Sequence, residues 1–387
     1  MAEVDKVVGA GVPAAAAPAT SGAGVPAAAA SAPAAGRLSH PLYLEDLDLV
    51  CAANLGWDAL DGATVAVSGA TGMVGTFLVD VLMRKRLQDG LDVRVLALGR
   101  NEARIRSRLP YASNEGFRAE EMDVSVPGSA PTQPADVIFH LASTTHPRAY
   151  ATQPVGTVAS NVVGLMNLLE YACGRPESPA RFVFASSVEV YGQNRGDVVR
   201  FDEKYCGYLD CNTLRAGYPE SKRCGEALCQ AYAAERGVPV YVPRLPRTFG
   251  PTVLPSDTKA ISQFIGKGVA HEDVVLKSEG TQTFSYLYVA DSVAGMLHVL
   301  AHGVQGEAYN LADERCDVSL RALAGAIAQS SGTNVVFELP DEVERAGYST
   351  ATRAMLDASK VQATGWRARY GMDEGMDRTL RILRDLR

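Results

Sequence analysis

The stretch VAVSGATGMVG, residues 65–75, starts as an apolar run and continues through three glycines at three-residue spacing. The run TFLVDVLMRKR that follows has helical periodicity, so the pattern predicts a strand, a tight turn and a helix. The first glycine permits the turn, the second lets backbone N–H groups approach a diphosphate, and the third lets the helix pack closely on the strand. We therefore expect a dinucleotide-binding unit. The expected cofactor cradle comprises Gly69, Thr71, Gly72, Met73, Val74 and Gly75.

The composition narrows the class of protein. A chain of 387 residues that is 47% hydrophobic is long enough for two domains, or for one large domain with a smaller lobe. The net charge of -7 argues against a broad surface for polyanions, so we expect no nucleic-acid partner. The seven cysteines form no CxxC pair, which favours reduced thiols in the cytoplasm and no metal site. No run of 18 apolar residues occurs, and no membrane partner is expected.

The N-terminal region differs from the rest of the chain. Residues 7–36 are almost entirely Ala, Pro, Gly, Val, Ser and Thr, a composition that cannot bury enough apolar surface to offset the entropy of ordering. We expect residues 1–38 to be disordered. Residues 40–60 then have apolar side chains at helical spacing, which indicates a helix docked ahead of the first strand.

The residue after the second predicted strand bears on the choice of cofactor. The run VRVLAL, residues 93–98, has the length and composition of a buried parallel strand. An acidic residue at its end would accept the ribose 2′-hydroxyl of NAD, whereas this chain has Arg100, which suits a 2′-phosphate. NADP is therefore favoured over NAD. The alternative is that Arg100 stacks on the adenine, which an NAD enzyme would also allow.

Two further strand ends complete the expected cofactor site. Asp123 and Val124 follow a third strand and would bracket the adenine, although a surface turn is the alternative there. The apolar strand at residues 136–143 ends in small residues, which suit a ribose because open α/β sheets bind ligands along this edge. The expected contacts on that strand are Leu141, Ala142 and Ser143. Asn161 opens a helical pattern, NVVGLMNLLEYAC, as its cap or as a polar plug.

The residues that carry chemistry lie at the end of the next strand and on the helix after it. RFVFASSVEVYG, residues 181–192, is followed by Tyr218 and Lys222, which lie one helical turn apart and share a face. The lysine would lower the pKa of the tyrosine, so Tyr218 would act as base toward a substrate hydroxyl that also contacts Ser187. Strand alternation would put Ser187 and Glu189 on one face. Glu189 would then move a proton or hold a water, unless it only pairs with a nearby cation.

With these motifs the chain resembles the extended short-chain dehydrogenases/reductases that act on nucleotide sugars (NAD-dependent epimerases/dehydratases). Within them it is most similar to UDP-glucuronate decarboxylases (UDP-xylose synthases). The resemblance rests on HLASTTHPRAYATQPVGTVASNVVGLMNLLE, SSVEVYG, FGPTVLPSDTKAISQFI and QTFSYLYVADSVAGM. It implies oxidation at sugar carbon 4 with bound NAD(P). The implied catalytic residues are Ser187, Glu189, Tyr218 and Lys222, and the implied substrate contacts are Ser143, Asn161, Arg247, Gln263 and Phe284.

Three positions depart from the patterns of this group. The decarboxylases have arginine where this chain has Phe284, and asparagine where it has Arg247. Arg247 would move the positive charge toward a sugar carboxylate or a diphosphate, or would only form a salt bridge between the lobes. The 4,6-dehydratases have aspartate where this chain has Val188, which counts against simple dehydration.

We therefore expect an α/β fold with a doubly wound parallel sheet and a smaller C-terminal substrate lobe. The dinucleotide-binding domain would span residues 39–245, with 284–304 returning to it, and the substrate lobe residues 246–283 and 305–387. The alternatives to a decarboxylase are a nucleotide-sugar 4-epimerase, an atypical 4,6-dehydratase and, from another class, a non-catalytic dinucleotide-sensing protein. The resemblance also implies a homodimer formed by the helices at residues 161–173 and 218–234, whose apolar residues extend beyond one narrow stripe.

Overall fold

A computed structural model describes residues 34–145, 147–174, 178–342, 345 and 351–387, and its larger part is built on a parallel sheet of eight strands. In spatial order these are β3 (Phe117–Glu121), β2 (Arg94–Gly99), β1 (Thr64–Ser68), β4 (Val137–His140), β5 (Arg181–Phe184), β7 (Val240–Leu245) and β11 (Ala308–Asn310), with β6 (Ser186–Ser187) beside β7. The chain moves outward from β1 first in one direction and then in the other. The predicted doubly wound sheet is therefore confirmed.

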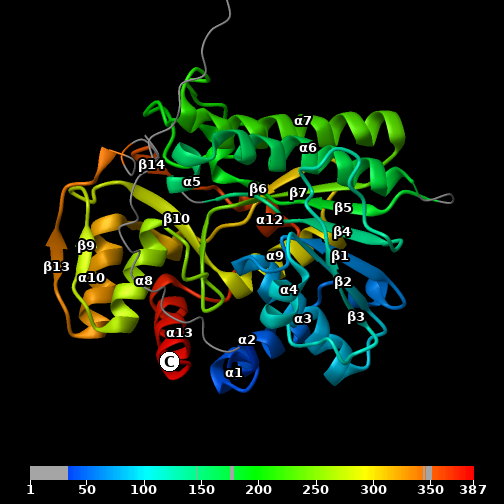
Figure 1. The fold of residues 1–387 in the computed structure, drawn as a ribbon. Helices are drawn as coiled ribbons and strands as arrows, with labels where there is room; N and C mark the ends of the chain where they lie inside the picture. Colours follow the sequence, from blue (N-terminus) through cyan, green and yellow to red (C-terminus); the bar gives the residue numbers. More distant parts are fainter. Residues whose placement is uncertain (1–33, 146, 175–177, 343–344, 346–350) are drawn as a thin grey trace, which may run out of the picture.

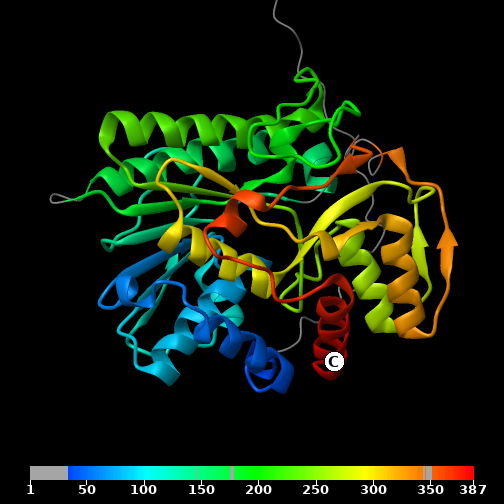
Figure 2. The same ribbon diagram turned by 180° about the vertical axis from the view of Figure 1, so that it is seen from behind.

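Helices cover both faces of this sheet (Figures 1 and 2). One face carries α6 (Pro154–Cys173) and α7 (Gly217–Arg236), and the other carries α2 (Pro41–Ala52), α3 (Met73–Asp89) and α9 (Val289–His302). On β1, Val65 and Val67 belong to one buried cluster, whereas Ala66 belongs to the cluster on the opposite face. Both faces of the strand are buried, which explains why its sequence is apolar without alternation.

Among the described residues, the smaller part comprises two short sheets and three longer helices, seen on the left of Figure 1 and at its centre. One sheet contains β8 (Arg247–Phe249), β10 (Thr283–Tyr288), β12 (Asp317–Ser319) and β14 (Arg353–Ala354), and the other pairs β9 (Val274–Leu276) with β13 (Val335–Phe337). The helices are α8 (Ala260–Ala270), α10 (Leu320–Ser331) and α13 (Met372–Asp385). Since β8 follows β7 after one residue, the chain passes directly from the large sheet into the smaller part.

Short helical segments join these elements. They are α1 (Ala34–Arg37), η1 (Trp57–Leu60), α4 (Glu102–Arg108), α5 (Pro147–Thr152), η2 (Val188–Tyr191), η3 (Leu214–Ala216), η4 (Glu314–Cys316) and α12 (Ser359–Ala363). None of the helices in the described part of the chain has the length and apolar character that crossing a bilayer requires.

The observed elements shift the predicted domain limits. Strand β10 begins the segment 284–304 that was assigned to the large domain, yet it pairs with β8 in the smaller part. Strand β11 was assigned to the substrate lobe, yet it pairs with β7 in the large sheet. Strand β11 has only three residues, too few for a hydrophobic pattern to predict which sheet it joins. Residues 1–33 of the segment predicted to be disordered lie outside the described residues, and Arg37 at its end is buried and bonded to Asp80 at 2.7 Å.

A buried carboxylate on α2 ties the two parts together. Asp46 has no exposed surface and accepts hydrogen bonds from the hydroxyls of Tyr288 (2.5 Å) and Tyr370 (2.8 Å). It also accepts from Nε of Arg378 on α13, at 2.8 Å. The four groups come from α2, β10, the segment before α13 and α13 itself. This cluster therefore fixes α13 against α2.

Asp46→Asn should lower the free energy of unfolding by about 3 kcal/mol, because it removes the buried carboxylate that accepts from Tyr288, Tyr370 and Arg378. The Arg378 guanidinium would keep only the half-exposed Glu45, at 2.9 Å, as its carboxylate partner. The matched control is Asp48→Asn on the same helix. Asp48 pairs with Arg84 but is half exposed, so its loss should cost less than about 1 kcal/mol. Urea denaturation followed by circular dichroism measures both changes, and equal losses in the two variants would contradict the assignment.

Candidate functional site

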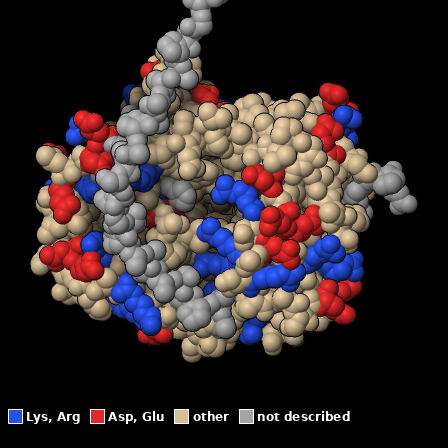
Figure 3. All heavy atoms as spheres, viewed as in Figure 1, with Lys and Arg blue, Asp and Glu red and all other residues tan. Residues whose placement is uncertain are grey.

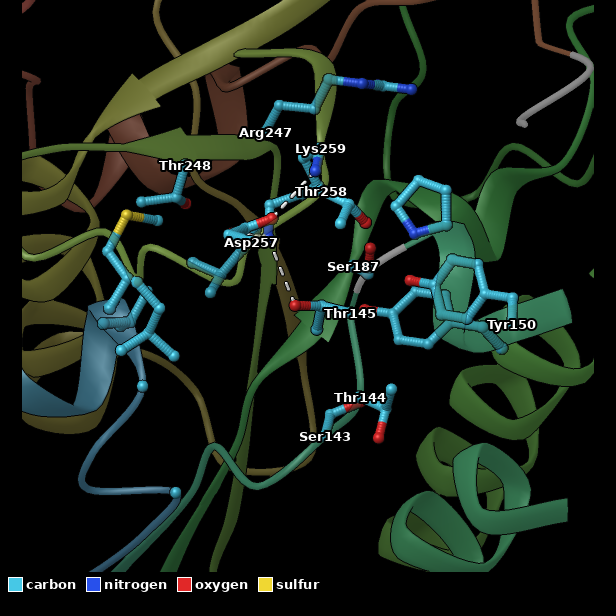
Figure 4. A pocket seen from close by; sticks show the side chains of 18 of the residues that line it. Ser143, Thr144, Thr145, Tyr150, Ser187, Arg247, Thr248, Asp257, Thr258 and Lys259 are labelled. Carbon is cyan, nitrogen blue, oxygen red and sulfur yellow. Dashed lines mark hydrogen bonds and ion pairs between the residues drawn. The ribbon is translucent and has the colours of Figure 1, made fainter. Parts of the chain in front are cut away.

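A cavity of about 800 Å³ runs along the C-terminal ends of β1, β2, β4 and β6 and reaches into the smaller part. It is lined by Gly69, Thr71, Gly72, Met73, Val74, Gly75, Arg100, Asp123, Val124, Leu141, Ala142, Ser143, Ser187, Glu189, Tyr218, Lys222, Arg247, Gln263 and Phe284. These are the site residues predicted from the sequence, with the exception of Asn161. Figure 4 shows part of the lining, with Ser143 and Thr144 in its lower part, Thr145 and Ser187 at the centre, and Thr248, Lys259 and Arg247 in its upper part.

The glycine turn forms one end of the cavity. Gly69 has a φ of +73°, and Gly72 is the N-cap of α3. A Cβ atom added at Gly75 would lie 2.3 Å from the carbonyl oxygen of Gly69, so only glycine lets α3 start this close to the turn. The first N–H groups of α3 lack partners within the helix and point toward this end, as a diphosphate requires.

Two arginines and one carboxylate lie at the end of the cavity where the sequence predicts the adenosine. Arg100 is exposed directly after β2, and Asn101 caps α4 by accepting from the backbone N–H of Arg104. Arg104 also lines the cavity. Oδ1 of Asp123 accepts from the Ser125 hydroxyl (2.6 Å) and backbone N–H (2.9 Å), and these bonds hold the pKa of Asp123 below its usual value. In Figure 3, Lys and Arg side chains gather around a hollow on this face.

The residues along β4 fit the sugar of a dinucleotide. The hydroxyl oxygen of Ser143 is buried and has no hydrogen-bond partner within the described part of the chain. It follows Leu141 and Ala142 on the edge of the cavity, where a ribose hydroxyl would meet it. Together with the glycine turn, this unpartnered hydroxyl indicates that the chain fits a dinucleotide.

Ser187, Tyr218 and Lys222 line the same cavity, where β6 ends and α7 begins. Ser187 ends β6, Tyr218 is the second residue of α7, and Lys222 follows one turn later. The Lys222 ammonium donates to the carbonyl of Ala185 at 2.8 Å and lies 6.0 Å from the centre of the Tyr218 ring. Burial lowers the pKa of Lys222 to about 8 and raises that of Tyr218 to about 12, with the Ser187 hydrogen bond opposing the rise. The predicted lowering of the Tyr218 pKa by Lys222 is therefore wrong for this arrangement, because burial outweighs the distant ammonium.

Glu189 lies at the same place, but not for the reason predicted. The strand ends at Ser187, and residues 188–191 form the single turn η2, with Oγ of Ser187 accepting from the N–H of Glu189 at 3.3 Å. The alternation argument is therefore wrong, although both side chains line the cavity. Glu189 pairs with Arg215 at 2.6 Å and with Arg247 at 3.8 Å. Burial favours the neutral acid, yet the two arginines together hold the pKa of Glu189 below its usual value.

Asn161 does not take part in the cavity. It is fully buried within α6, and its amide donates to the hydroxyl of Ser221 on α7 at 2.9 Å. The expected direct contact between Asn161 and substrate is therefore wrong. The residue is instead the polar plug that joins the two helices next to Lys222, because α6 begins seven residues earlier, at Pro154.

Several lining residues were missed by sequence reasoning. Tyr150 on α5 stacks on Tyr218, with ring centres 5.1 Å apart, and the Arg215 guanidinium lies 5.0 Å from the centre of the Tyr150 ring. Arg215 is three residues before Tyr218, so a cation at helical spacing from the relay was an available signal. Lys259 donates to Asp257 (2.5 Å) and to Thr145 (3.4 Å), and so joins the start of α8 to the loop after β4 (Figure 4).

Comparison with known proteins agrees with this geometry. A model of the NAD dependent epimerase/dehydratase family matches residues 65–312. UDP-glucuronic acid decarboxylase 1 of Xenopus tropicalis is 30% identical over 325 residues, which cover 84% of this chain and 73% of that protein. UDP-glucuronic acid decarboxylase 2 of Arabidopsis thaliana is 29% identical over 318 residues, covering 81% of this chain and 67% of that protein.

Solved structures share the fold. An epimerase of Methanothermobacter thermautotrophicus superposes with a TM-score of 0.71 at 21% identity, over 89% of this chain and 96% of that one. The UDP-glucuronic acid 4-epimerase of Bacillus cereus, solved with UDP-glucuronic acid and NAD, has a TM-score of 0.69 at 19% identity, over 84% of this chain and 100% of that one. At these identities the likeness concerns the fold alone.

Proposed function

Since the chain belongs to the NAD-dependent epimerase/dehydratase family, we propose that it oxidises carbon 4 of a nucleotide-diphosphate sugar with bound NAD(P) and then decarboxylates the sugar. The observation that carries the proposal is the meeting of Ser187, Tyr218 and Lys222 in the cavity that begins at the glycine turn. The similarity to UDP-glucuronic acid decarboxylases supports an acidic sugar. The smaller part of the chain would hold the sugar nucleotide through Gln263, Arg247 and Phe284.

The side chains support the following division of roles. The glycine turn and the residues after β4 would hold the dinucleotide, whose oxidised nicotinamide would supply an acceptor for the hydride of carbon 4 and its later return. Tyr218 takes the proton of the carbon-4 hydroxyl, and Ser187 hydrogen-bonds the same oxygen. Because burial raises the pKa of Tyr218 to about 12, this transfer needs stabilisation of the phenolate, which the Ser187 hydrogen bond and the charge of Arg215 provide. The Lys222 ammonium, 6.0 Å from the centre of the ring, adds a positive charge at the same place.

The ketone at carbon 4 prepares the second reaction. It makes a carboxylate on carbon 5 a β-keto acid, so the bond to the carboxylate breaks, carbon dioxide leaves and the electron pair moves to the carbon-4 oxygen as an enolate. Carbon 5 then takes up a proton. Since its two arginines keep Glu189 ionised, we assign Glu189 the role of holding the water that delivers this proton.

A 4-epimerase is the second candidate. The carboxylate of Glu189 is already paired with Arg215, and epimerisation at carbon 4 needs no proton at carbon 5. Dehydration is disfavoured because Val188, where dehydratases have an acid, is apolar and buried. A non-catalytic dinucleotide sensor would have no need of the side chains that meet at Tyr218.

Incubation of the protein with NAD(P) and a panel of UDP-, TDP-, GDP- and CDP-sugars, with products followed by mass spectrometry, tests the reaction. Carbon dioxide indicates decarboxylation, an isomer of equal mass indicates epimerisation, and a 4-keto-6-deoxy sugar indicates dehydration. No turnover of any sugar in the panel would sink the proposal.

With the true substrate, Glu189→Gln should still reduce the bound cofactor, seen as absorbance of the reduced nicotinamide, but should stall before product. Tyr218→Phe is the matched comparison, since it should lose at least roughly two orders of magnitude in cofactor reduction itself. Product formed at the wild-type rate by Glu189→Gln would exclude an essential carboxylate and favour the 4-epimerase.

We further propose that NADP is preferred over NAD. The support is Arg100 after β2, with Arg104 beside it along the cavity and no acidic residue directly after the strand.

Arg100→Ala should weaken NADP binding roughly tenfold or more while changing NAD binding little, because only the 2′-phosphate loses a charge-assisted partner. Arg106→Ala is the control, because Arg106 on α4 is half exposed, pairs with Glu102 and does not line the cavity. Calorimetric titration with both dinucleotides decides it, and a wild-type preference for NAD would refute it.

We also propose a cytoplasmic homodimer formed by α6 and α7. The support is the exposed apolar surface of α6, which includes Val155, Val158 and Met166, while the neighbouring Leu165 and Leu168 are used within the subunit. Light scattering at micromolar concentration should give the mass of two chains, and Met166→Glu should shift it to one. Leu87→Glu, at an exposed leucine on α3, should leave the dimer intact. A wild-type monomer would be the contrary result.

A further inference from the structure

Two arginines in the cavity share a single carboxylate. Arg215 donates to Oε2 of Glu189 at 2.6 Å, whereas Arg247 approaches Oε1 of the same residue only to 3.8 Å, beyond hydrogen-bonding distance. Both guanidinium groups are mostly buried, with 15% and 19% of the side chain exposed. The three groups together therefore carry one net positive charge in a largely enclosed place.

Each guanidinium lies against an aromatic ring. The central carbon of Arg247 is 3.4 Å from the centre of the Phe284 ring, and that of Arg215 is 5.0 Å from the centre of the Tyr150 ring. An arginine stacked in this way is held by its flat face, which leaves the N–H edge for an anion. Phe284 and Tyr150 thus orient the two cations in advance.

The N–H edges are not fully used. Nη1 of Arg247, and Nε and Nη1 of Arg215, are buried and have no hydrogen-bond partner among the described residues. Burial lowers the pKa of Arg247 despite the charge of Glu189, whereas at Arg215 burial is outweighed, chiefly by Glu189 at 2.6 Å, and the pKa is raised. Glu189 therefore compensates Arg215 more fully than Arg247. A buried cation with unused donors is costly, because the protein interior does not replace its lost hydration. The cluster therefore has one carboxylate fewer than it needs to pair both arginines.

We propose that the missing anion is a carboxylate on the sugar of the substrate, and that Arg247, stacked on Phe284, is the residue that selects an acidic sugar over a neutral one. The inference rests on the proposed function, which already requires a carboxylate on the sugar, and adds the residue that recognises this carboxylate. Arg247 approaches Glu189, two residues beyond Ser187, so its charge lies beside the sugar carbons that react. A second carboxylate would give each arginine one partner and would bring the four groups to zero net charge.

The nucleotide diphosphate is the other anion that a sugar nucleotide brings, so the experiment separates the two. The Tyr218→Phe background prevents turnover, and calorimetric titration with UDP, UDP-glucose and UDP-glucuronate, at saturating NAD(P), gives three dissociation constants. UDP-glucuronate should bind more tightly than UDP-glucose. Adding Arg247→Gln should weaken UDP-glucuronate by roughly 10- to 100-fold, the usual worth of a buried charge-assisted contact, with UDP and UDP-glucose within about twofold.

Three further variants sharpen the result. Arg247→Lys keeps the charge without the flat stacking face and should retain part of the preference, and Phe284→Leu should lose part of it. Arg321→Gln is the matched control, because Arg321 also lies over a phenylalanine, Phe337, at 5.4 Å but does not line the cavity. It should change none of the three constants. NAD(P) affinity equal to that of the parent confirms that each variant is folded.

The outcomes that overturn the inference are distinct. Equal weakening of UDP, UDP-glucose and UDP-glucuronate by Arg247→Gln would assign Arg247 to the diphosphate. An unchanged preference for UDP-glucuronate would leave Arg247 as a structural cation only. In either case the proposed function would stand, whereas failure of all three probes to bind the Tyr218→Phe protein, together with no turnover of any sugar in the panel by the wild type, would overturn both.

Discussion

Close backbone packing at the turn between β1 and α3 determines where the cavity lies. A Cβ atom at Gly69 would lie 2.8 Å from the backbone N of Ala142, and one at Gly75 would lie 2.3 Å from the Gly69 carbonyl oxygen. Because glycine has no side chain, the end of β4, the turn and the start of α3 come together at one edge of the sheet. This edge then offers unpaired N–H groups to a diphosphate, and the relay residues line the same cavity.

The second constraint is electrostatic and links the two parts of the chain. Arg215 comes from the segment before α7, Glu189 from the turn after β6, and Arg247 from β8 in the smaller sheet. Their cluster lies where the large sheet passes into the smaller one. Because it holds two cations and one carboxylate, the approach of an anionic sugar changes the charge balance of groups that lie beside Tyr218 and Ser187. If the proposed roles hold, we expect recognition of the sugar and proton transfer to be coupled through Glu189.

The sequence allowed the sheet, the glycine cradle and the relay to be predicted, since each rests on short-range spacing. The apolar run before Gly69 and the single turn between Tyr218 and Lys222 depend on local geometry that residue types reveal. Features set by tertiary packing were missed. The pKa of Tyr218 depends on its burial and on a Lys222 ammonium that turns to Ala185, and Tyr150 reaches the ring of Tyr218 from a separate helix. Asn161 was assigned to substrate because an amide looks the same in a sequence whether it lines a cavity or joins two helices.

The central claim is that the relay oxidises carbon 4 of a sugar nucleotide. It is tested most directly with UDP-glucuronate carrying deuterium on carbon 4, added to stoichiometric amounts of the Glu189→Gln protein with bound NAD(P). Mass spectrometry of the released cofactor reports where the label goes. The account predicts reduced cofactor that is heavier by one deuterium and a sugar that has lost it. Reduced cofactor without the label, or a label that stays on the sugar, would contradict the account.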